Sequence, residues 1–381
     1  MNFGTKWKRI AVLALAVMLS AAAVFVFCYR LRGQWHEVGN AFLRADYSFL
    51  MPALLLTGLL YVLRTLRWRL FLRPVENVSF GPTLRATCIG FMASCVLPLR
   101  AGEIIRPYVL HKNSRVSFGA AAGTGVGLER VFDLTAACML LLLTLVLLSW
   151  NGPPRMEHRR TAPEGVVGFS TESADSVSSL SDQVRDKGIW LAGMTGFGAV
   201  VMLAMAFAPN LTMKPAQVAL RLAPHRIRSP LNKFLLSLTK SMQFLRSPFQ
   251  VAVAMGLSFG IWFCYPTSTF FVAKAFGLEL PFVGALFVHL LITVAVVPPQ
   301  APAFVGLFHV AAMTGATLFG VSQGRAGAFA SLLWAVNIIP ISAVGLFFLW
   351  QEGLGLSFLT QSLGAFSEGR NSVKGDVDNA T

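Results

Sequence analysis

Two short stretches of the chain, CVLPLRAGEIIR and GLERVFDL, place ionisable side chains inside otherwise apolar sequence. Their ionisable residues are Arg100, Glu103, Arg106, Glu129, Arg130 and Asp133. At the centre of a membrane each such residue costs roughly 2.5–3.5 kcal/mol, so the whole set left unpaired would cost about 15–20 kcal/mol. We therefore expect these residues to form ion pairs, to line a hydrated cavity or to reach the membrane boundary.

The first stretch has the features of an anion-binding helix start. Pro98 removes a backbone donor and breaks a helix, and Gly102 tolerates the tight return of the chain. The helix that begins after the break presents free N–H groups and the positive end of its dipole. Arg100 lies at that start, and Arg106 follows about two turns later. We expect a phosphate group to bind Arg100, Gly102 and Arg106.

The second stretch complements the first in charge. Glu129 and Asp133 are four residues apart and share a helix face, whereas Arg130 lies about 100° round the helix. The sequence favours ion pairs between these two carboxylates and Arg100 or Arg106. A common role, balancing charge or exchanging protons, is expected for Glu103, Glu129, Arg130 and Asp133.

The alternative interpretation is that these residues lie at the boundary and extend their charged ends to the cytoplasmic headgroups. It suits Arg64, Arg67 and Arg69 well, because they follow one another in a basic joint. It suits Arg100 and Glu103 less well, because an ordinary boundary needs no break within the apolar stretch.

The composition indicates which elements must position these residues. Of 381 residues, 55% are hydrophobic and 13% are charged, whereas charged residues make up about a quarter of a soluble domain. The apolar residues form blocks of roughly 20, the length that spans a bilayer. The sequence therefore predicts an all-α polytopic membrane protein. The stretches long enough to span are about 10–29, 48–66, 117–150, 189–208, 249–273 and 326–350.

Two further apolar stretches, 83–97 and 282–297, stop at proline, and a short segment follows each, 101–112 and 303–320. We expect two re-entrant helical hairpins that enter from opposite leaflets. Their breaks fall at Pro98, Pro298, Pro299 and Pro302. Proline-broken segments at corresponding places in two halves point to an inverted repeat around a central site. The alternatives are that each arm is a thin full span, or that both hairpins are merely kinked helices.

The placement of charge predicts the orientation. The net charge is +15, and basic residues crowd the joints at 64–73 and 214–246, whereas 151–187 is richer in acids. Because Lys and Arg gather on the cytoplasmic side, we expect both termini inside and 151–187 to be a flexible outer loop. Residues 214–246 suggest a cytoplasmic amphipathic segment. We take 1–366 as a single transmembrane domain and 367–381 as a disordered tail.

The same charges suit anionic membrane lipids as partners rather than nucleic acid, because they lie at membrane borders. The cysteines occupy apolar stretches without a CxxC pair, and the histidines form no HExxH motif. We therefore expect no disulfide framework, no metal site and no cofactor. The first apolar block follows basic residues as a signal peptide does, but it is longer and lacks a persuasive cleavage site, so we expect it to be retained.

Three segments resemble a known family. GFMASCVLPLRAGEIIRPYVL, GLERVFDL and VVPPQAPAFVGLF occur in this order and resemble the flippase-like family, the transmembrane region of lysylphosphatidylglycerol synthases. The similarity runs over about residues 10–350 and includes Arg67 and Trp68. It implies a multi-pass, lipid-handling protein of the bacterial cytoplasmic membrane. Some members carry a soluble aminoacyl-transferase domain, for which 381 residues leave no room, so the resemblance implies a stand-alone translocating protein.

The resemblance can be carried over only at matching positions. These positions are Pro98, Arg100, Gly102, Glu103, Arg106, Glu129, Arg130 and Asp133. The family tends to have asparagine where this chain has Ser94 and Cys95. Its third motif is usually glycine-rich and followed by an acid, where this chain has Ala303, Phe304 and His309. These departures leave open the role of the second hairpin and the headgroup it accepts.

The leading hypothesis is a lipid flippase or transporter without catalytic residues, which holds the headgroup of an anionic lipid between two hairpin tips. The alternative is an intramembrane transferase acting on a polyprenyl-phosphate or phospholipid, with Glu103, Glu129 or Asp133 as general base. An enzyme should also bind a soluble donor, and the sequence offers no nucleotide-binding motif for one. A third hypothesis is a structural partner of a separate lipid-modifying synthase.

Overall fold

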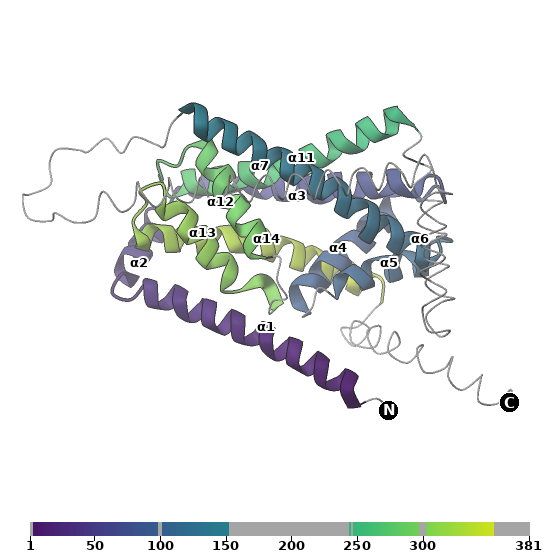
Figure 1. The fold of residues 1–381 in the computed structure, drawn as a ribbon, viewed down its shortest axis with the longest axis horizontal. Helices are drawn as coiled ribbons and strands as arrows, with labels where there is room; N and C mark the ends of the chain where they lie inside the picture. Colours follow the sequence, from purple (N-terminus) through teal and green to yellow (C-terminus); the bar gives the residue numbers. More distant parts are fainter. Residues whose placement is uncertain (1–2, 98–100, 152–243, 245–246, 297–301, 354–381) are drawn as a thin grey trace, which may run out of the picture. The chain divides into compact units, whose positions relative to one another are not determined.

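The computed structural model describes residues 3–97, 101–151, 244, 247–296 and 302–353, and the described residues form helices joined by short turns (Figure 1). The chain divides into two compact units. The first takes residues from 1–59, 134–197 and 262–337, and the second from 60–133, 198–261 and 338–381. Each unit contains one pair of short helices separated by a break.

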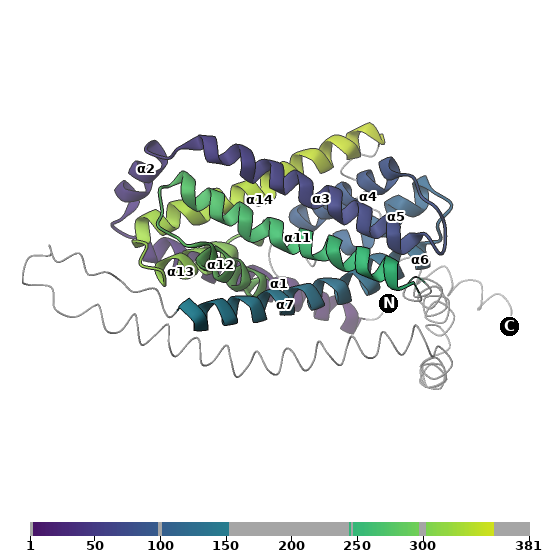
Figure 2. The ribbon, with the colours of Figure 1, turned by 90° about the horizontal axis from the view of Figure 1, so that it is seen from above.

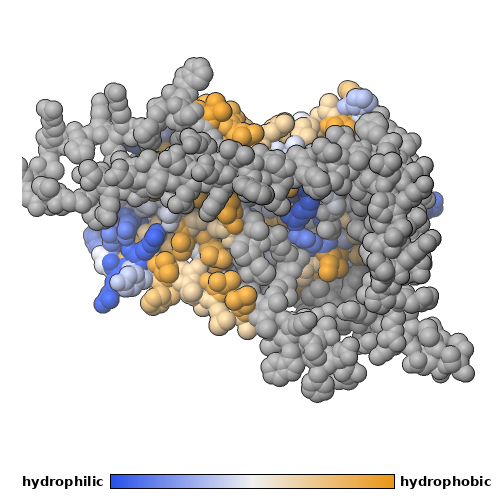
Figure 3. Space-filling model, viewed as in Figure 1, coloured by the Kyte–Doolittle hydropathy of each residue, from blue (hydrophilic) through white to orange (hydrophobic). Residues whose placement is uncertain are grey.

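Three helices within the described residues are long and apolar enough to cross a membrane. They are α3 (Leu50–Leu72) with the 3-10 turn Tyr47–Phe49 before it, α11 (Pro248–Ala275) and α14 (Gln323–Gln351). They coincide with the spans predicted at 48–66, 249–273 and 326–350. Large apolar side chains on all three are exposed, and apolar residues appear on the described surface in Figure 3. The chain is a helical membrane protein.

The other predicted spans agree with the structure to different degrees. The stretch 10–29 lies within α1 (Phe3–Arg30), which precedes the short helix α2 (Trp35–Leu43). The stretch 117–150 is helical, but its helix changes type along its length. It consists of α6 (Phe118–Ala122), a π-helical turn (Gly123–Leu128) and α7 (Glu129–Asn151). The predicted span 189–208 lies outside the described residues.

The first pair of short helices is α4 (Phe80–Val96) and α5 (Gly102–Asn113), in the second unit. The predicted break is confirmed, because α4 ends two residues before Pro98 and Leu97 is extended, the conformation that a following proline favours. Pro98 and Arg100 themselves lie outside the described residues. The two helices are 17 and 12 residues long, shorter than the roughly 20 residues that a span needs.

The absence of side chains on two glycines allows α4 and α5 to pack closely. A Cβ on Gly102 would overlap the carbonyl oxygen of Gly90 and the side chain of Ser94, and one on Gly90 would overlap the side chain of Arg106. These contacts match residues early in one helix with residues late in the other, so the pair is an antiparallel hairpin. Gly102 does not have a positive φ. It therefore serves close packing rather than the tight return expected from the sequence.

The second pair, in the first unit, is α12 (Phe282–Ala295) and α13 (Leu307–Thr317), which lie side by side in Figures 1 and 2. Pro298 and Pro299 lie outside the described residues, and Pro302 begins a 3-10 turn that precedes α13. The predicted break between the two helices is confirmed. The arms are 14 and 11 residues long, again too short for ordinary spans.

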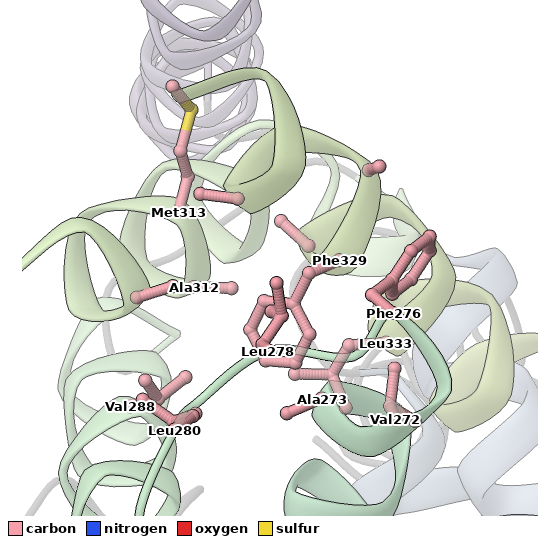
Figure 4. Close-up of a cluster of buried hydrophobic side chains, with 14 of the residues drawn as sticks. Val272, Ala273, Phe276, Leu278, Leu280, Val288, Ala312, Met313, Phe329 and Leu333 are labelled. Atoms are coloured by element: carbon pink, nitrogen blue, oxygen red, sulfur yellow. The ribbon is translucent and has the colours of Figure 1, made fainter. Parts of the chain in front are cut away.

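The core of the first unit is apolar and forms where the end of α11 meets α14 (Figure 4). Leu278, Phe329 and Leu333 are buried there and point toward one another. Most of the predicted loop 151–187, the amphipathic segment 214–246 and the tail 367–381 lie outside the described residues. Phe244 is an exception, and its ring packs against Phe71 and Phe132 in the second unit.

Candidate functional site

Five of the six charged residues predicted from the sequence meet around the first turns of α7 in the second unit, and the sixth, Arg100, lies outside the described residues. Glu129 is the first residue of this helix, and Asp133 follows one turn later on the same face, as predicted. Glu129 is 3% exposed, and the Asp133 side chain is 15% exposed. Two carboxylates so far from solvent must be stabilised by partners.

The partner of Glu129 is Arg106, which confirms one of the predicted ion pairs. The two terminal nitrogens of Arg106 donate to the two oxygens of Glu129 at 2.6 and 3.0 Å, and one of them also donates to Thr87 at 3.3 Å. The Arg106 guanidinium lies 3.9 Å from the centre of the Trp68 ring. A two-pronged ion pair stacked on an indole is a strong and geometrically specific arrangement.

Trp68 links this ion pair to the π-helical turn. Its indole N–H donates to the Thr124 hydroxyl at 3.0 Å, and a Cβ added to Gly125 would lie 3.3 Å from the same nitrogen. Trp68 is fully buried, and its ring lies between Arg106 and the turn that precedes Glu129. The register of α7 is therefore tied to α3 and to the first hairpin.

Asp133 binds two arginines of α3, which corrects a prediction. Arg67 donates through one terminal nitrogen to Asp133 at 2.7 Å and to Ser258 at 2.8 Å, and Arg64 lies 3.6 Å from the other oxygen of Asp133. Arg67 is fully buried and Arg64 is 8% exposed. The alternative interpretation, in which Arg64 and Arg67 extend to the headgroups, is therefore wrong for these two residues.

Arg64 and Arg67 are three residues apart, so they face the same side of α3. That spacing indicates that the two side chains share a face, but not whether this face points into the protein or to the membrane boundary. Arg69 projects from a different side of the helix, is only partly buried, and donates to the carbonyl of Val78 at 2.9 Å. Ser258 was missed, because it is 191 residues from Arg67 and nothing in the sequence marks it.

A third ion pair joins Arg130 of α7 to Glu103 of α5. It is much more open than the other two, with side chains 52% and 33% exposed. The three charged residues at the start of α7 therefore hold α3 and α5 through different partners. Exposed pairs of this kind contribute little to stability.

The buried part of this cluster is rich in positive charge. The buried charged residues described in the second unit are Arg64, Arg67, Arg106 and Glu129. With the partly exposed Asp133, three guanidinium groups stand against two carboxylates. Nearby, α5 begins without a side-chain hydrogen bond at Ala101, so its first N–H groups are not capped by a side chain there. The arrangement favours an anion.

The second hairpin has a different chemistry. The sequences of α12 and α13 contain no residue charged at neutral pH, only His289 and His309. Ala303 and Phe304 have φ of 58° and 57°, which is unfavourable for residues with a Cβ. The indole of Trp334 donates to the carbonyl of Ala303 at 2.8 Å and so fixes this turn. The helices of the second hairpin therefore offer no guanidinium or ammonium group for an anion, unlike those of the first.

Glu129 and Asp133, two of the three candidate general bases, are poorly placed for acid–base chemistry. Both oxygens of Glu129 are occupied by Arg106, and Asp133 lies between Arg67 and Arg64. A general base must reach the proton that it removes, whereas these two groups are held by cations. The geometry of Glu129 and Asp133 therefore does not favour a general-base role for these two residues.

Comparison with known families places most of the chain in a described family. Residues 11–345 match the family described as the lysylphosphatidylglycerol synthase TM region. This range contains both hairpins, the start of α7 and the arginines of α3. No curated protein and no solved structure matches the chain.

Proposed function

Because the chain belongs to the lysylphosphatidylglycerol synthase TM region family, whose members have a lipid-related role in membranes, we propose that it is a lipid flippase or transporter. It moves an anionic, phosphate-bearing lipid between the leaflets of the bacterial cytoplasmic membrane. The observation that carries this proposal is the excess of buried guanidinium groups over carboxylates around the first hairpin. A buried excess of positive charge is costly without an anion.

The two hairpins are re-entrant in this proposal. Arms of 17, 12, 14 and 11 residues rise roughly 25, 18, 21 and 16 Å, against a hydrocarbon core of about 30 Å. Irregular backbone at membrane depth is tolerated where it lines water or is buried in protein. A break that ends inside the membrane therefore offers a hydrated place for a lipid headgroup, while the acyl chains stay in the bilayer.

The phosphate binds at the start of α5, to Arg100, Arg106 and the backbone N–H of Gly102. The uncapped first turn and the helix dipole favour an anion there. Glu129 holds the terminal nitrogens of Arg106, so Arg106 contributes its positive field and the buried Nε, which has no hydrogen-bond partner among the described residues. Glu103 and Arg130 exchange partners as the headgroup enters, because their ion pair is the most exposed of the three.

The decisive experiment is leaflet exchange in proteoliposomes. Purified full-length protein is reconstituted with fluorescent phosphatidylglycerol or phosphatidylcholine, and the lipid in the outer leaflet is quenched with dithionite over time. We expect faster exchange of the anionic lipid with wild-type protein and a loss of at least about tenfold, or 1.4 kcal/mol, with Arg100→Ala. Arg73→Ala, an exposed arginine just after α3, is the matched control and should behave as wild type.

Two results would contradict the proposal. Exchange that is unaffected by Arg100→Ala would reject this binding site. Formation of a new lipid product in the same liposomes, followed by mass spectrometry and without exchange, would favour an intramembrane transferase instead.

A further inference from the structure

Arg67 makes a different kind of contact from Arg106. Only one of its terminal nitrogens is used, for Asp133 at 2.7 Å and Ser258 at 2.8 Å. The other terminal nitrogen, Nη2, and the Nε are buried and have no hydrogen-bond partner among the described residues. Nε and Nη2 form one edge of the guanidinium, and parallel donors on one edge match the oxygens of a phosphate or carboxylate.

Ser258 fixes the orientation of this edge. Its hydroxyl donates to the carbonyl of Ala254 at 2.8 Å, so the oxygen faces Arg67 as an acceptor. Asp133 and Ser258 both accept hydrogen bonds from Nη1 of Arg67, and each of the two is positioned by its own helix. The Nε–Nη2 edge is thereby held in one direction, which lowers the entropic cost of binding a ligand to it.

The surroundings do not otherwise compensate this edge. The Phe71 ring centre lies 6.0 Å from the Arg67 guanidinium, at the limit of a cation–π contact, whereas Trp68 lies 3.9 Å from that of Arg106. Charged donors that are buried and unmet are among the costliest groups in a protein. Arg67 is fully buried, so solvent in this conformation does not reach it.

We propose that the Nε–Nη2 edge of Arg67 is a second anion-binding subsite, separate from the start of α5, and that its ligand is an oxyanion with a single negative charge, a phosphodiester. At this subsite Arg64 and Arg67 share the single carboxylate of Asp133, so one negative charge balances them, whereas a dianion would leave an excess of negative charge. Asp133 and the buried Arg64 keep 15% and 10% of their side chains exposed, and they mark the side from which the ligand enters when the cluster opens. Identifying the phosphodiester as that of a transported lipid rests on the proposed function.

Binding of small probes to the full-length protein in phosphatidylcholine nanodiscs tests the subsite by calorimetry. The probes are dimethyl phosphate as a free phosphodiester, methyl phosphate as a monoester with two charges at a pH of about 8, and dihexanoyl-phosphatidylglycerol as a lipid phosphodiester. We expect wild type to prefer both diesters over the monoester. Arg67→Lys keeps the charge and the pair with Asp133 but removes the planar edge, so diester binding should fall at least about tenfold and the preference should disappear.

Two further variants distinguish a loss of ligand binding from a general effect on folding. Ser258→Ala keeps the ion pair and loses only the orientation of Arg67, so we expect a several-fold loss of diester affinity even if Arg67→Lys folds poorly. Arg73→Lys, on an exposed residue of the same segment, should bind as wild type. Unchanged diester affinity in both Arg67→Lys and Ser258→Ala, or tighter binding of methyl phosphate by wild type, would overturn the inference.

The lipid probe separates this inference from the proposed function. Arg67-dependent binding of dimethyl phosphate without any leaflet exchange would support the subsite and reject the flippase. Leaflet exchange that depends on Arg100 while both diesters bind Arg67→Lys as they bind wild type would reject the subsite alone.

Discussion

At the scale of single residues, the charged cluster is built from carboxylates that each hold an arginine from another helix. Glu129 holds Arg106 of the first hairpin, and Asp133 holds Arg67 of α3. Removing one partner of a buried pair leaves an uncompensated charge, which is more harmful than removing both. The cluster should therefore behave as coupled pairs rather than as independent residues.

The pair Arg106–Glu129 gives the first prediction. We expect Glu129→Gln to lower the free energy of unfolding by about 3–5 kcal/mol, because Arg106 would remain buried and unpaired. Adding Arg106→Met should restore much of the loss. Denaturation of the purified protein by SDS, followed by circular dichroism, measures all four members of this double-mutant cycle.

The matched control is the exposed pair, in which Glu103→Gln should cost no more than about 1 kcal/mol. Additive effects of Glu129→Gln and Arg106→Met would show that the two groups are not coupled, contrary to the geometry.

Sequence alone could predict part of this site. The ion pair of Arg106 with Glu129 was foreseeable, because both residues are charged, lie in apolar sequence and need a partner. The role of Arg67 was not, because an arginine near the end of an apolar helix equally suits the membrane boundary. Only the fold brings Ser258 and Asp133 to the same guanidinium.

At the scale of elements, the first hairpin depends on close contact between helix backbones. Gly102 begins α5 against the Gly90 carbonyl and Ser94 of α4. The helix breaks were predictable, because proline dictates them locally. The close contact was not, because glycine in a sequence signals either conformational freedom or small size, and only the packing distinguishes the two.

Gly102→Ala should therefore destabilise the hairpin. The added methyl would overlap the Gly90 carbonyl oxygen, and overpacking of this kind costs typically about 1–3 kcal/mol. Gly81→Ala in α4 is the control, because a Cβ there meets nothing within 4 Å and alanine is the better helix former. Thermal unfolding in detergent should move in opposite directions for the two variants, and equal shifts would contradict this account of Gly102.

In the turn before α13, replacing alanine by glycine tests the opposite effect, a gain in stability when a methyl group is removed. Ala303 has a φ of 58°, a conformation that costs a residue with a Cβ roughly 1–2 kcal/mol. Glycine avoids this cost, but it loses part of the gain because a glycine in the unfolded chain has more conformational entropy to give up on folding. We expect Ala303→Gly to raise the unfolding free energy by up to about 1 kcal/mol. Ala311→Gly, within α13, should lower it by about 1 kcal/mol. A destabilised Ala303→Gly protein would show that this turn carries no strain.

At the scale of the whole molecule, each compact unit contains one hairpin and draws on segments from distant parts of the sequence. The family match at 11–345 covers both. The helical class and the breaks followed from composition and proline, whereas the division into two units did not, because it depends on contacts between segments far apart in the chain. The predicted inverted repeat and the positions of the termini remain predictions.

The predicted orientation can be measured with cysteine labelling. We expect a cysteine introduced at Ser170, in the stretch predicted to face outward, to react with an impermeant maleimide in intact cells. A cysteine at Ser372, near the C-terminus, should react only after permeabilisation. Both reactions are compared in a background in which the exposed Cys28 is replaced by serine. The reverse pattern would invert the orientation.

The π-helical turn at Gly123–Leu128 makes this helix tolerant of a change in chain length at one place. A π turn accommodates a residue more than an α-helix would in the same rise. Deleting one residue from it would allow an uninterrupted α-helix and would leave Glu129 and Asp133 facing the arginines that they now neutralise. The same deletion within α6 would rotate both carboxylates by about 100° relative to the preceding part of the helix. The electrostatic balance of the cluster thus depends on the phase of one helix, and the position of a lost codon decides whether that phase survives.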